Sequence, residues 1–193
     1  MKFSLIELRD LTISIIILAL AFSSFNLDLF PVTLFVIVLV FASHEILGHK
    51  LVAQKYGCFA EYKAWPLGLA LGLVTAFLPF KFAAPGAVYI SPVTKEKFAF
   101  KVVHLTKREY RLISLAGPLV NLIVGFSLVF VNVFLNPIAF YKEIFILTSQ
   151  VSFFLAFFNL LPVAPLDGEK ILNWNKRIWI VVIVLAIAGY FVI

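Results

Sequence analysis

The sequence predicts an all-α, polytopic membrane protein that forms a single membrane-embedded domain over residues 1–193. The first observation is composition: 63% of the residues are hydrophobic, only 13% are charged, and the mean hydropathy is +1.06. A water-soluble domain of this length needs more charged residues to cover its surface. The second observation is that several apolar runs approach the ~20 residues that a spanning helix needs, and no linker-like stretch separates them.

About five transmembrane helices are expected. The first apolar run is short and ends at a turn that contains Asn26, Asp28 and Pro31. The second run is purely apolar in its first half and ends at Gly57, where a glycine suits a helix C-terminus. The expected spans are approximately residues 11–25, 31–57, 112–135, 144–161 and 178–193.

The segment between the second and third spans, residues 59–110, has a different character. It contains four prolines, and its apolar run from Trp65 to Phe80 is short and punctuated. The alternation in FKFAAPGAVYISP is typical of short strands. Irregular backbone at membrane depth is tolerated where protein or a water-filled cavity surrounds it. We therefore expect an interfacial or re-entrant segment that contains short β-strands.

Basic residues are distributed unevenly about these spans. If the spans alternate across the bilayer, all of the 16 lysine and arginine residues except Lys142 lie on the side of the N-terminus. Cytoplasmic loops carry such an excess, so the N-terminus and the basic central loop are expected to be cytoplasmic. If residues 65–80 crossed the bilayer, the basic residues that follow them in the central loop would lie on the opposite side, so we do not expect a span there. The net charge of +6 then reflects orientation in the lipid bilayer, and no nucleic-acid partner is expected.

The second span contains three residues that are able to bind a metal or transfer a proton, namely His44, Glu45 and His49. An ionisable residue inside a span costs roughly 2.5–3.5 kcal/mol on insertion scales and generally marks function. One interpretation is a polar group satisfied by neighbouring helices, or a proton relay in a small transporter or channel. However, two histidines with an intervening glutamate are also the elements of the HExxH zinc-peptidase motif, in which the glutamate lies beside the metal-bound water.

The spacing of these residues departs from that motif, because the sequence reads HEILGH. In a straight α-helix, residues four apart differ by about 40° around the axis, whereas residues five apart differ by about 140°. A π-bulge, with its i→i+5 pairing, would bring His44 and His49 together again, and Gly48 would ease the distortion. The sequence therefore predicts a bulge around Ile46–Gly48. The soluble dipeptidyl-peptidase III family is similar in using a HELLGH-type zinc motif.

A zinc site needs a third protein ligand and an open position for water. His104 is one candidate, although it belongs to the basic loop. Asp167 is another, because it lies in PLDG just past the fourth span, on the same side as the second half of the second span. On its own, however, an Asp-Gly pair is typical of a turn or a helix N-cap.

Three motifs together resemble the site-2 proteases, which are membrane zinc metalloproteases. Their pattern is HExxH in one span, a GPxxN element, and NxxPxxxxDG near the end of a later span. This chain has HEILGHKLVAQKYG, LAGPLVN and NLLPVAPLDGEKIL in that order, within roughly residues 31–175. The matching positions after the first motif are Gly117, Pro118 and Asn121, and then Asn159, Pro162, Asp167 and Gly168. The one departure is the extra residue in HEILGH.

The resemblance implies that His44, His49 and Asp167 bind zinc and that Glu45 acts as general base and acid. Asn121 and Asn159 would hold the substrate backbone or stabilise the oxyanion, although interhelical hydrogen bonds are an equal alternative for them. The implied activity is intramembrane proteolysis in or near transmembrane segments of other proteins. Independently of the resemblance, we hypothesise that the strand-like GAVYISP holds an unwound substrate by strand addition.

Two other functions remain open from the sequence. One is a catalytically inactive site-2-protease-like protein that binds membrane helices. The other is a transporter or proton-coupled channel, although the inverted repeats that favour transport are not evident. The sequence specifies neither the oligomeric state nor the physiological substrate.

Overall fold

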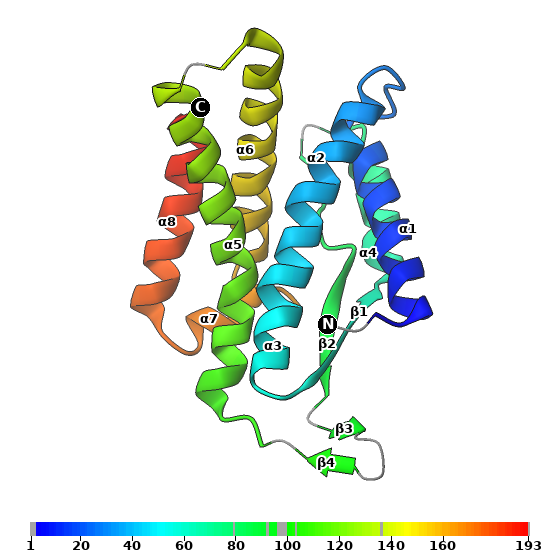
Figure 1. Ribbon diagram of the computed structural model, residues 1–193, viewed down its shortest axis with the longest axis vertical. Helices are drawn as coiled ribbons and strands as arrows, with labels where there is room; N and C mark the ends of the chain where they lie inside the picture. The colour runs from blue at the N-terminus through cyan, green and yellow to red at the C-terminus, as the bar shows by residue number, and fades with distance from the viewer. Residues whose placement is uncertain are drawn as a thin grey trace.

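Helices make up most of the molecule, as the sequence predicts. The structure, a computed structural model, describes residues 3–78, 80–91, 93–95, 100–102, 104–135 and 137–192. The long helices run roughly along the long axis of the molecule, and β3 and β4 lie at its lower end in this view (Figure 1). The helices are α1 (Leu5–Phe22), α2 (Phe30–Ala42), the π-helix η1 (Ser43–Lys50), α3 (Leu51–Lys55), α4 (Pro66–Thr75), α5 (Lys107–Phe134), α6 (Ala139–Asn159), α7 (Asp167–Leu172) and α8 (Lys176–Val192). The strands are β1 (Phe59–Ala64), β2 (Gly86–Ser91), β3 (Val93–Lys95) and β4 (Phe100–Val102).

Three helices are long and apolar enough to cross a membrane. They are Phe30–Lys55, in which α2, η1 and α3 follow one another without a break, then Lys107–Phe134, and then Tyr141–Asn159. Helices at the second, third and fourth predicted spans are thereby confirmed. Helices also occupy the first and fifth predicted positions, but α1 carries three charged residues in its first half, and α8 is only 17 residues long.

The segment between α3 and α5 contains short strands, as predicted. β1 and β2 pair antiparallel, from Phe59↔Ser91 to Ala64↔Gly86, and β3 pairs with β4. The apolar run that begins at Trp65 forms α4, which has 10 residues and is well short of a spanning length. Pro79 and Pro92, two of the four prolines in this segment, lie outside the described residues.

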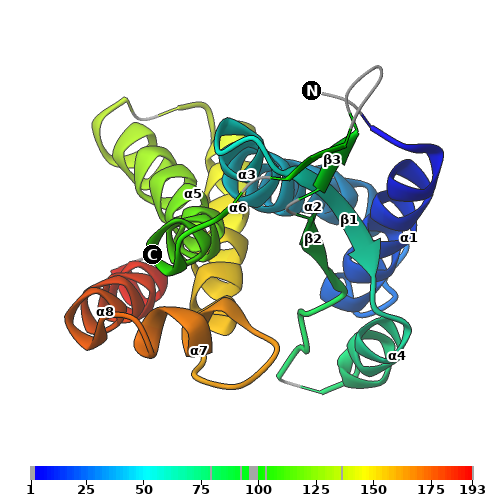
Figure 2. The same cartoon turned by 90° about the horizontal axis from the view of Figure 1, so that it is seen from below.

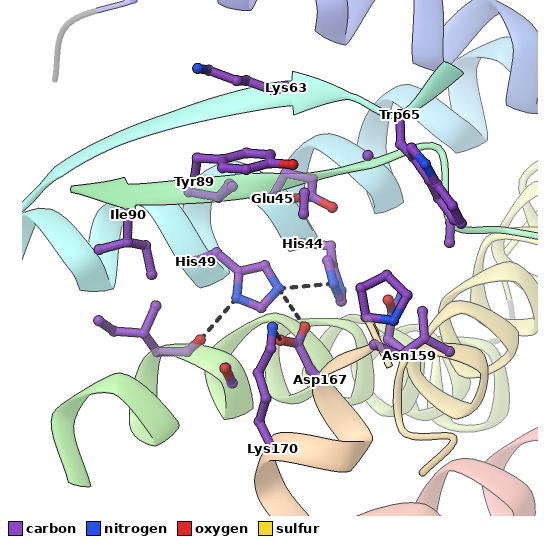
Figure 3. A pocket seen from close by; sticks show the side chains of 18 of the residues that line it. His44, Glu45, His49, Lys63, Trp65, Tyr89, Ile90, Asn159, Asp167 and Lys170 are labelled. Carbon is purple, nitrogen blue, oxygen red and sulfur yellow. Dashed lines mark hydrogen bonds and ion pairs between the residues drawn. The ribbon is translucent and has the colours of Figure 1, made fainter. Parts of the chain in front are cut away.

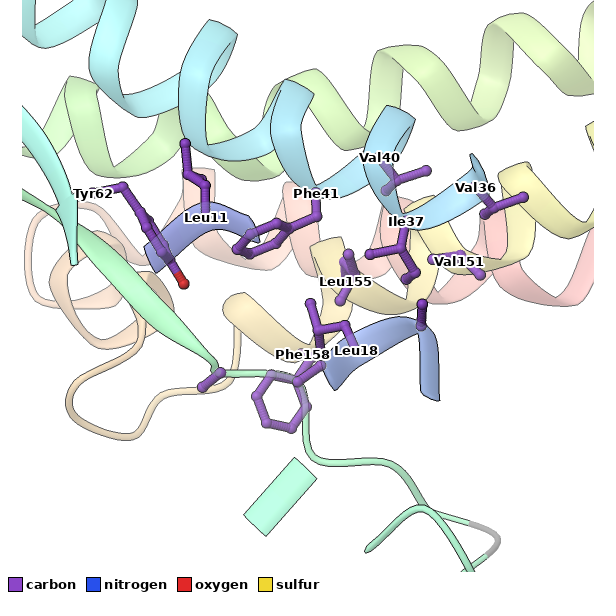
Figure 4. Packing of buried hydrophobic residues seen from close by; sticks show 13 residues of the cluster. Leu11, Leu18, Val36, Ile37, Val40, Phe41, Tyr62, Val151, Leu155 and Phe158 are labelled. Carbon is purple, nitrogen blue, oxygen red and sulfur yellow. The ribbon is translucent and has the colours of Figure 1, made fainter. Parts of the chain in front are cut away.

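The continuous helix α2–η1–α3 lies between two groups of elements. Seen from below, α7 and α8 lie on one side, and α1, α4 and the β1–β2 ribbon lie on the other (Figure 2). One buried cluster joins α1, α2, β1 and α6 around Ile37 and Phe41 (Figure 4). A second joins α5, α6 and α8 around Phe153. A Cβ at Gly125 or Gly189 would lie 2.7 or 2.3 Å from the Phe153 ring, so these glycines allow the helices to pack closely.

Polar side chains on one face of α1 fasten this helix to the outer edge of β1. The N–H of Tyr62 donates to Glu7 Oε1 at 3.1 Å, and the N–H of Ala64 donates to Asp10 Oδ2 at 3.0 Å. The other oxygen of Glu7 accepts a hydrogen bond from Lys50 of η1, and both side chains of this ion pair are almost completely buried. Glu7 therefore joins α1, β1 and η1 at one point.

Candidate metal centre

The HEILGH segment forms the π-helix η1, Ser43–Lys50, inside the longest apolar helix of the first half of the chain. Its i→i+5 hydrogen bonding continues to the end of the segment, where the N–H of Leu51 donates to the carbonyl of Ile46. The Nε2 atoms of His44 and His49 consequently lie 3.1 Å apart. The distortion predicted from the spacing is confirmed.

Two facing glycines allow α5 to approach η1 closely. A Cβ on Gly48 would lie 2.6 Å from the Cα of Gly117. A Cβ on Gly117 would lie 2.3 Å from His49 Nε2 and 2.8 Å from His44 Cε1. Both imidazoles therefore rest against the backbone of α5 at the glycine of LAGPLVN, and any side chain at this position would displace them.

The orientation of His49 is fixed by a backbone carbonyl of α5. His49 Nδ1 lies 2.9 Å from the carbonyl oxygen of Ile113. A carbonyl only accepts hydrogen bonds, so Nδ1 carries a proton and donates it. Nε2 then points toward His44 and Asp167, which is the geometry that a metal-binding imidazole needs.

Asp167, the first residue of α7, brings a carboxylate to the two histidines. Its Oδ2 lies 3.1 Å from His49 Nε2, and its Oδ1 accepts a hydrogen bond from Lys170 Nζ at 3.0 Å. Burial by itself raises the pKa of Asp167, but the facing His49 imidazole and the Lys170 ammonium outweigh it and lower this pKa below its usual range. The carboxylate is therefore ionised, as a metal ligand must be.

Within the described residues, His44, His49 and Asp167 form a group of potential metal ligands whose donor atoms all lie within 4.8 Å of one another. Two imidazoles and one carboxylate suit zinc, which in catalytic sites takes three protein ligands and leaves a fourth position open. The fit is supported by the packing of the ligands, because all three are at most 8% exposed and converge without an intervening side chain. These residues could therefore hold a zinc ion.

Glu45 lies beside this group and lines a cavity of about 330 Å³. Its Oε2 is buried, and no hydrogen-bond partner for it is found among the described residues. The cavity is enclosed by side chains from η1, β1, β2, α5, α6 and α7, and β2 lies nearer to the histidines than β1 does (Figure 3). Glu45 therefore brings to the cavity wall a carboxyl group with one unpaired oxygen.

The two asparagines of the sequence motifs have different positions. Asn159, at the end of α6, lines the cavity, and its Nδ2 donates to the carbonyl of Leu155 at 3.0 Å. Asn121 is completely buried in α5, and its Nδ2 lies 3.0 Å from His44 Nδ1 rather than in the cavity wall. His104 is exposed in the loop before α5 and is not part of the ligand group.

Sequence reasoning missed Lys170 and the aromatic residues of the cavity wall. Lys170 holds the second oxygen of Asp167, and its i,i+3 spacing from this residue in a short helix was the available signal. Trp65 and Tyr89 line the cavity from the segment that was predicted only as irregular with short strands. Nothing in the local sequence indicates that these aromatic residues line the cavity.

The protein is helical, and three of its helices could span a membrane. It also has a buried His-His-Asp group beside a glutamate, and such an arrangement is typical of zinc hydrolases. Over 192 residues, the chain is 38% identical to a Methanocaldococcus jannaschii protein provisionally named a zinc metalloprotease. That match covers 98% of this chain and 94% of the relative. The chain belongs to the zinc metalloprotease family of this relative, and its cofactor is zinc.

Two further relatives carry similar names. A zinc metalloprotease of the same archaeon is 30% identical over 170 residues, which are 87% of this chain but only 41% of that longer relative. A Bacillus subtilis protein, also provisionally named a zinc metalloprotease, is 29% identical over 162 residues, covering 79% of this chain and 72% of the relative. No family model and no solved structure matches the chain.

Proposed function

We propose that this protein is an intramembrane zinc endopeptidase of the site-2 protease type, which hydrolyses peptide bonds in or near transmembrane segments of membrane proteins. The observation that carries the proposal is the position of His44, Glu45 and His49. They lie within a 26-residue helix that is apolar enough to cross a membrane, and Asp167 faces them from α7. A metalloprotease site in such a helix acts on substrates at membrane depth.

The proposed topology has five spans, with α1 and α8 crossing the bilayer beside the three long apolar helices. The N-terminus and the basic loop between α3 and α5 are cytoplasmic, because this arrangement places all lysines and arginines except Lys142 on one side. The ligand group then lies toward the cytoplasmic end of its helix. The partners are the lipid bilayer and the transmembrane helix of a substrate protein.

In the proposed mechanism, His44, His49 and Asp167 would hold zinc, and the facing atoms are the two Nε2 atoms and Oδ2 of Asp167. Zinc, when bound, lowers the pKa of water and polarises the scissile carbonyl. Glu45 takes the proton of the attacking water with its unpaired Oε2 and then delivers this proton to the leaving amine. Asn159 contributes the cavity-facing amide that holds the substrate backbone or the developing oxyanion.

An intact helix hides its own peptide bonds, so the substrate must be extended where it is cut. β2 lies along the cavity, and an extended segment would add to it as a further strand. Strand addition would present the peptide bond beside Glu45 and the ligand group.

Metal analysis of the purified protein tests the ligand set directly. We expect about one zinc per chain in the wild type, and loss of this zinc in His49→Ala and Asp167→Ala because each variant lacks one of three ligands. Glu45→Gln should keep the zinc and lose cleavage of a membrane substrate. His104→Ala is the matched control, and it should change neither property.

The same measurements separate the alternatives. Wild-type protein that is purified without metal would contradict the zinc assignment. Zinc-loaded wild type that cleaves no helical substrate would instead identify a catalytically inactive relative. A proton relay predicts that Glu45→Gln abolishes proton transport in vesicles, which the peptidase proposal does not.

A further inference from the structure

Asn121 is buried in α5 and meets a metal-ligand candidate that lies 77 positions away in the sequence. Its side-chain amide lies 3.0 Å from Nδ1 of His44, and the residue is 0% exposed. It does not line the cavity where Asn159 lies. A direct contact with substrate is therefore not available to Asn121, and its only polar neighbour in the ligand group is His44.

The proton of the His44 imidazole decides what this contact can do. Nε2 of His44 is the nitrogen that faces His49, so it is the atom that would bind zinc. An imidazole that binds a metal through Nε2 keeps its proton on Nδ1 and donates it to a neighbour. The only acceptor that an asparagine side chain offers is Oδ1.

Oδ1 of Asn121 is a buried acceptor for which the described residues provide no partner. A half-turn of the amide exchanges Oδ1 and Nδ2, and this exchange places the oxygen against His44 Nδ1. The unpaired acceptor then receives the Nδ1 proton of His44, beside the Gly117 carbonyl that also hydrogen-bonds this ring. One rotation of one side chain thus converts the contact into the partner that a zinc-bound His44 needs.

We propose that Asn121 is a positioning residue for zinc, whose Oδ1 accepts the Nδ1–H of His44 and directs Nε2 of this histidine at the metal. The inference rests on the proposed zinc site. His49 has an equivalent partner, because its Nδ1 donates to the carbonyl of Ile113. Ile113 and Asn121 are eight residues apart, about two turns of α5, so the same helix orients both imidazoles.

Zinc affinity tests this assignment without using catalysis. Competition against a chromophoric zinc chelator would give the dissociation constant of wild type, Asn121→Leu, Asn121→Asp and Asn132→Leu in detergent. We expect Asn121→Leu to bind zinc about 10- to 100-fold more weakly, the usual effect of losing the partner of a ligating histidine. Asn121→Asp keeps an acceptor oxygen and should retain near wild-type affinity. Asn132→Leu is the same substitution elsewhere on α5 and should have no effect.

Imidazole NMR of the zinc-loaded protein tests the tautomer even if a variant folds poorly. The chain has three histidines, so His104→Gln leaves only the two of the ligand group. With ¹⁵N-labelled histidine, we expect both remaining rings to be protonated at Nδ1 and unprotonated at Nε2. The His44 proton should be protected from exchange, and this protection should be lost in Asn121→Leu.

The outcomes distinguish this inference from the function on which it rests. Wild-type protein that binds no zinc would overturn both. Zinc binding of equal strength in wild type and Asn121→Leu would overturn only the inference, and the Gly117 carbonyl, which also hydrogen-bonds the His44 ring, would then be its partner. Loss of cleavage by Asn121→Leu at unchanged zinc affinity would also overturn it, because Asn121 would then act on substrate.

Discussion

The two edges of the β1–β2 ribbon have opposite surroundings. On the β1 side, carboxylates of α1 accept the outward N–H groups of Tyr62 and Ala64, so this edge is closed. On the β2 side lies the cavity that Glu45 and the ligand group line (Figure 3). In the part of the chain that the structure describes, no further strand pairs with β2 on that side.

The pairing register shows which groups of β2 face the cavity. Tyr62 is opposite Val88, and its N–H points away from β2 toward Glu7. In an antiparallel pair, opposite residues share the same hydrogen-bonding state, so the N–H and C=O of Val88 also point away from the ribbon. Of the two edges of the β1–β2 ribbon, only that of β2 can therefore accept an added strand.

The largest effect is expected from breaking the closed edge at its buried ion pair. Lys50→Met leaves the Glu7 carboxylate buried without its cation, which should lower the free energy of unfolding by about 3–5 kcal/mol. Thermal unfolding in detergent measures this change. Lys55→Met, the same substitution at an exposed position of α3, should have little effect. If Glu7→Gln combined with Lys50→Met does not recover part of the loss, the ion pair is not its cause.

An intermediate effect is expected from breaking the open edge. Val88→Pro removes the N–H that faces the cavity, and one lost backbone hydrogen bond of about 1 kcal/mol corresponds to a roughly 3- to 10-fold decrease in cleavage of a membrane substrate. Zinc content should be unchanged. Val88→Ala shortens the side chain but keeps the N–H, so it should cleave almost normally. Equal loss of zinc and cleavage in Val88→Pro would mean that β2 is only structural.

The smallest effect is expected at Asp10. Burial raises the pKa of this carboxyl, but the N–H of Ala64 and the neighbouring Arg9 outweigh it and lower the pKa below 3.8. A lowered pKa stabilises the folded state above the unfolded pKa, and this contribution is lost as the pH falls through the folded value. Asp10→Asn should therefore destabilise the protein by less than about 1 kcal/mol at pH 7, and by progressively less below about pH 4.

Unfolding measured between pH 3 and pH 7 checks this pH dependence. Asp28→Asn, in the exposed turn after α1, is the control and should unfold like the wild type at each pH. A difference between Asp10→Asn and wild type that grows as the pH falls would contradict the assigned direction.

The local pattern of the sequence was sufficient for the long helices and for the bulge in η1. The i,i+5 spacing of His44 and His49 has only one helical solution that brings both rings together, so it could be read directly. Choosing Asp167 as the third candidate ligand required the resemblance to site-2 proteases, because an Asp-Gly pair alone is also typical of a turn. The Glu7–Lys50 pair could not be predicted, since its partners are 43 residues apart and each also fits an exposed helix end.

The positions of the two motif asparagines also could not be predicted from the local sequence. Asn121 and Asn159 both lie at apolar helix positions, and no local pattern distinguishes a side chain behind a histidine from one in the cavity wall. Their roles depend on how α5 and α6 are rotated about their axes, which the packing of Phe153 between Gly125 and Gly189 helps to set. Helix rotation is a property of the whole bundle, so it becomes visible only in three dimensions.

The π-helix also has a consequence for how such a site can vary between proteins. One extra residue inserted in an α-helix turns every later side chain by about 100° around the axis. In η1 the wider turn absorbs the insertion locally, so α3 and the chain after it keep the faces that they would have with a motif one residue shorter. The number of residues between the two histidines can therefore change without affecting the rest of the fold. An insertion or deletion here need not turn the later side chains toward other neighbours.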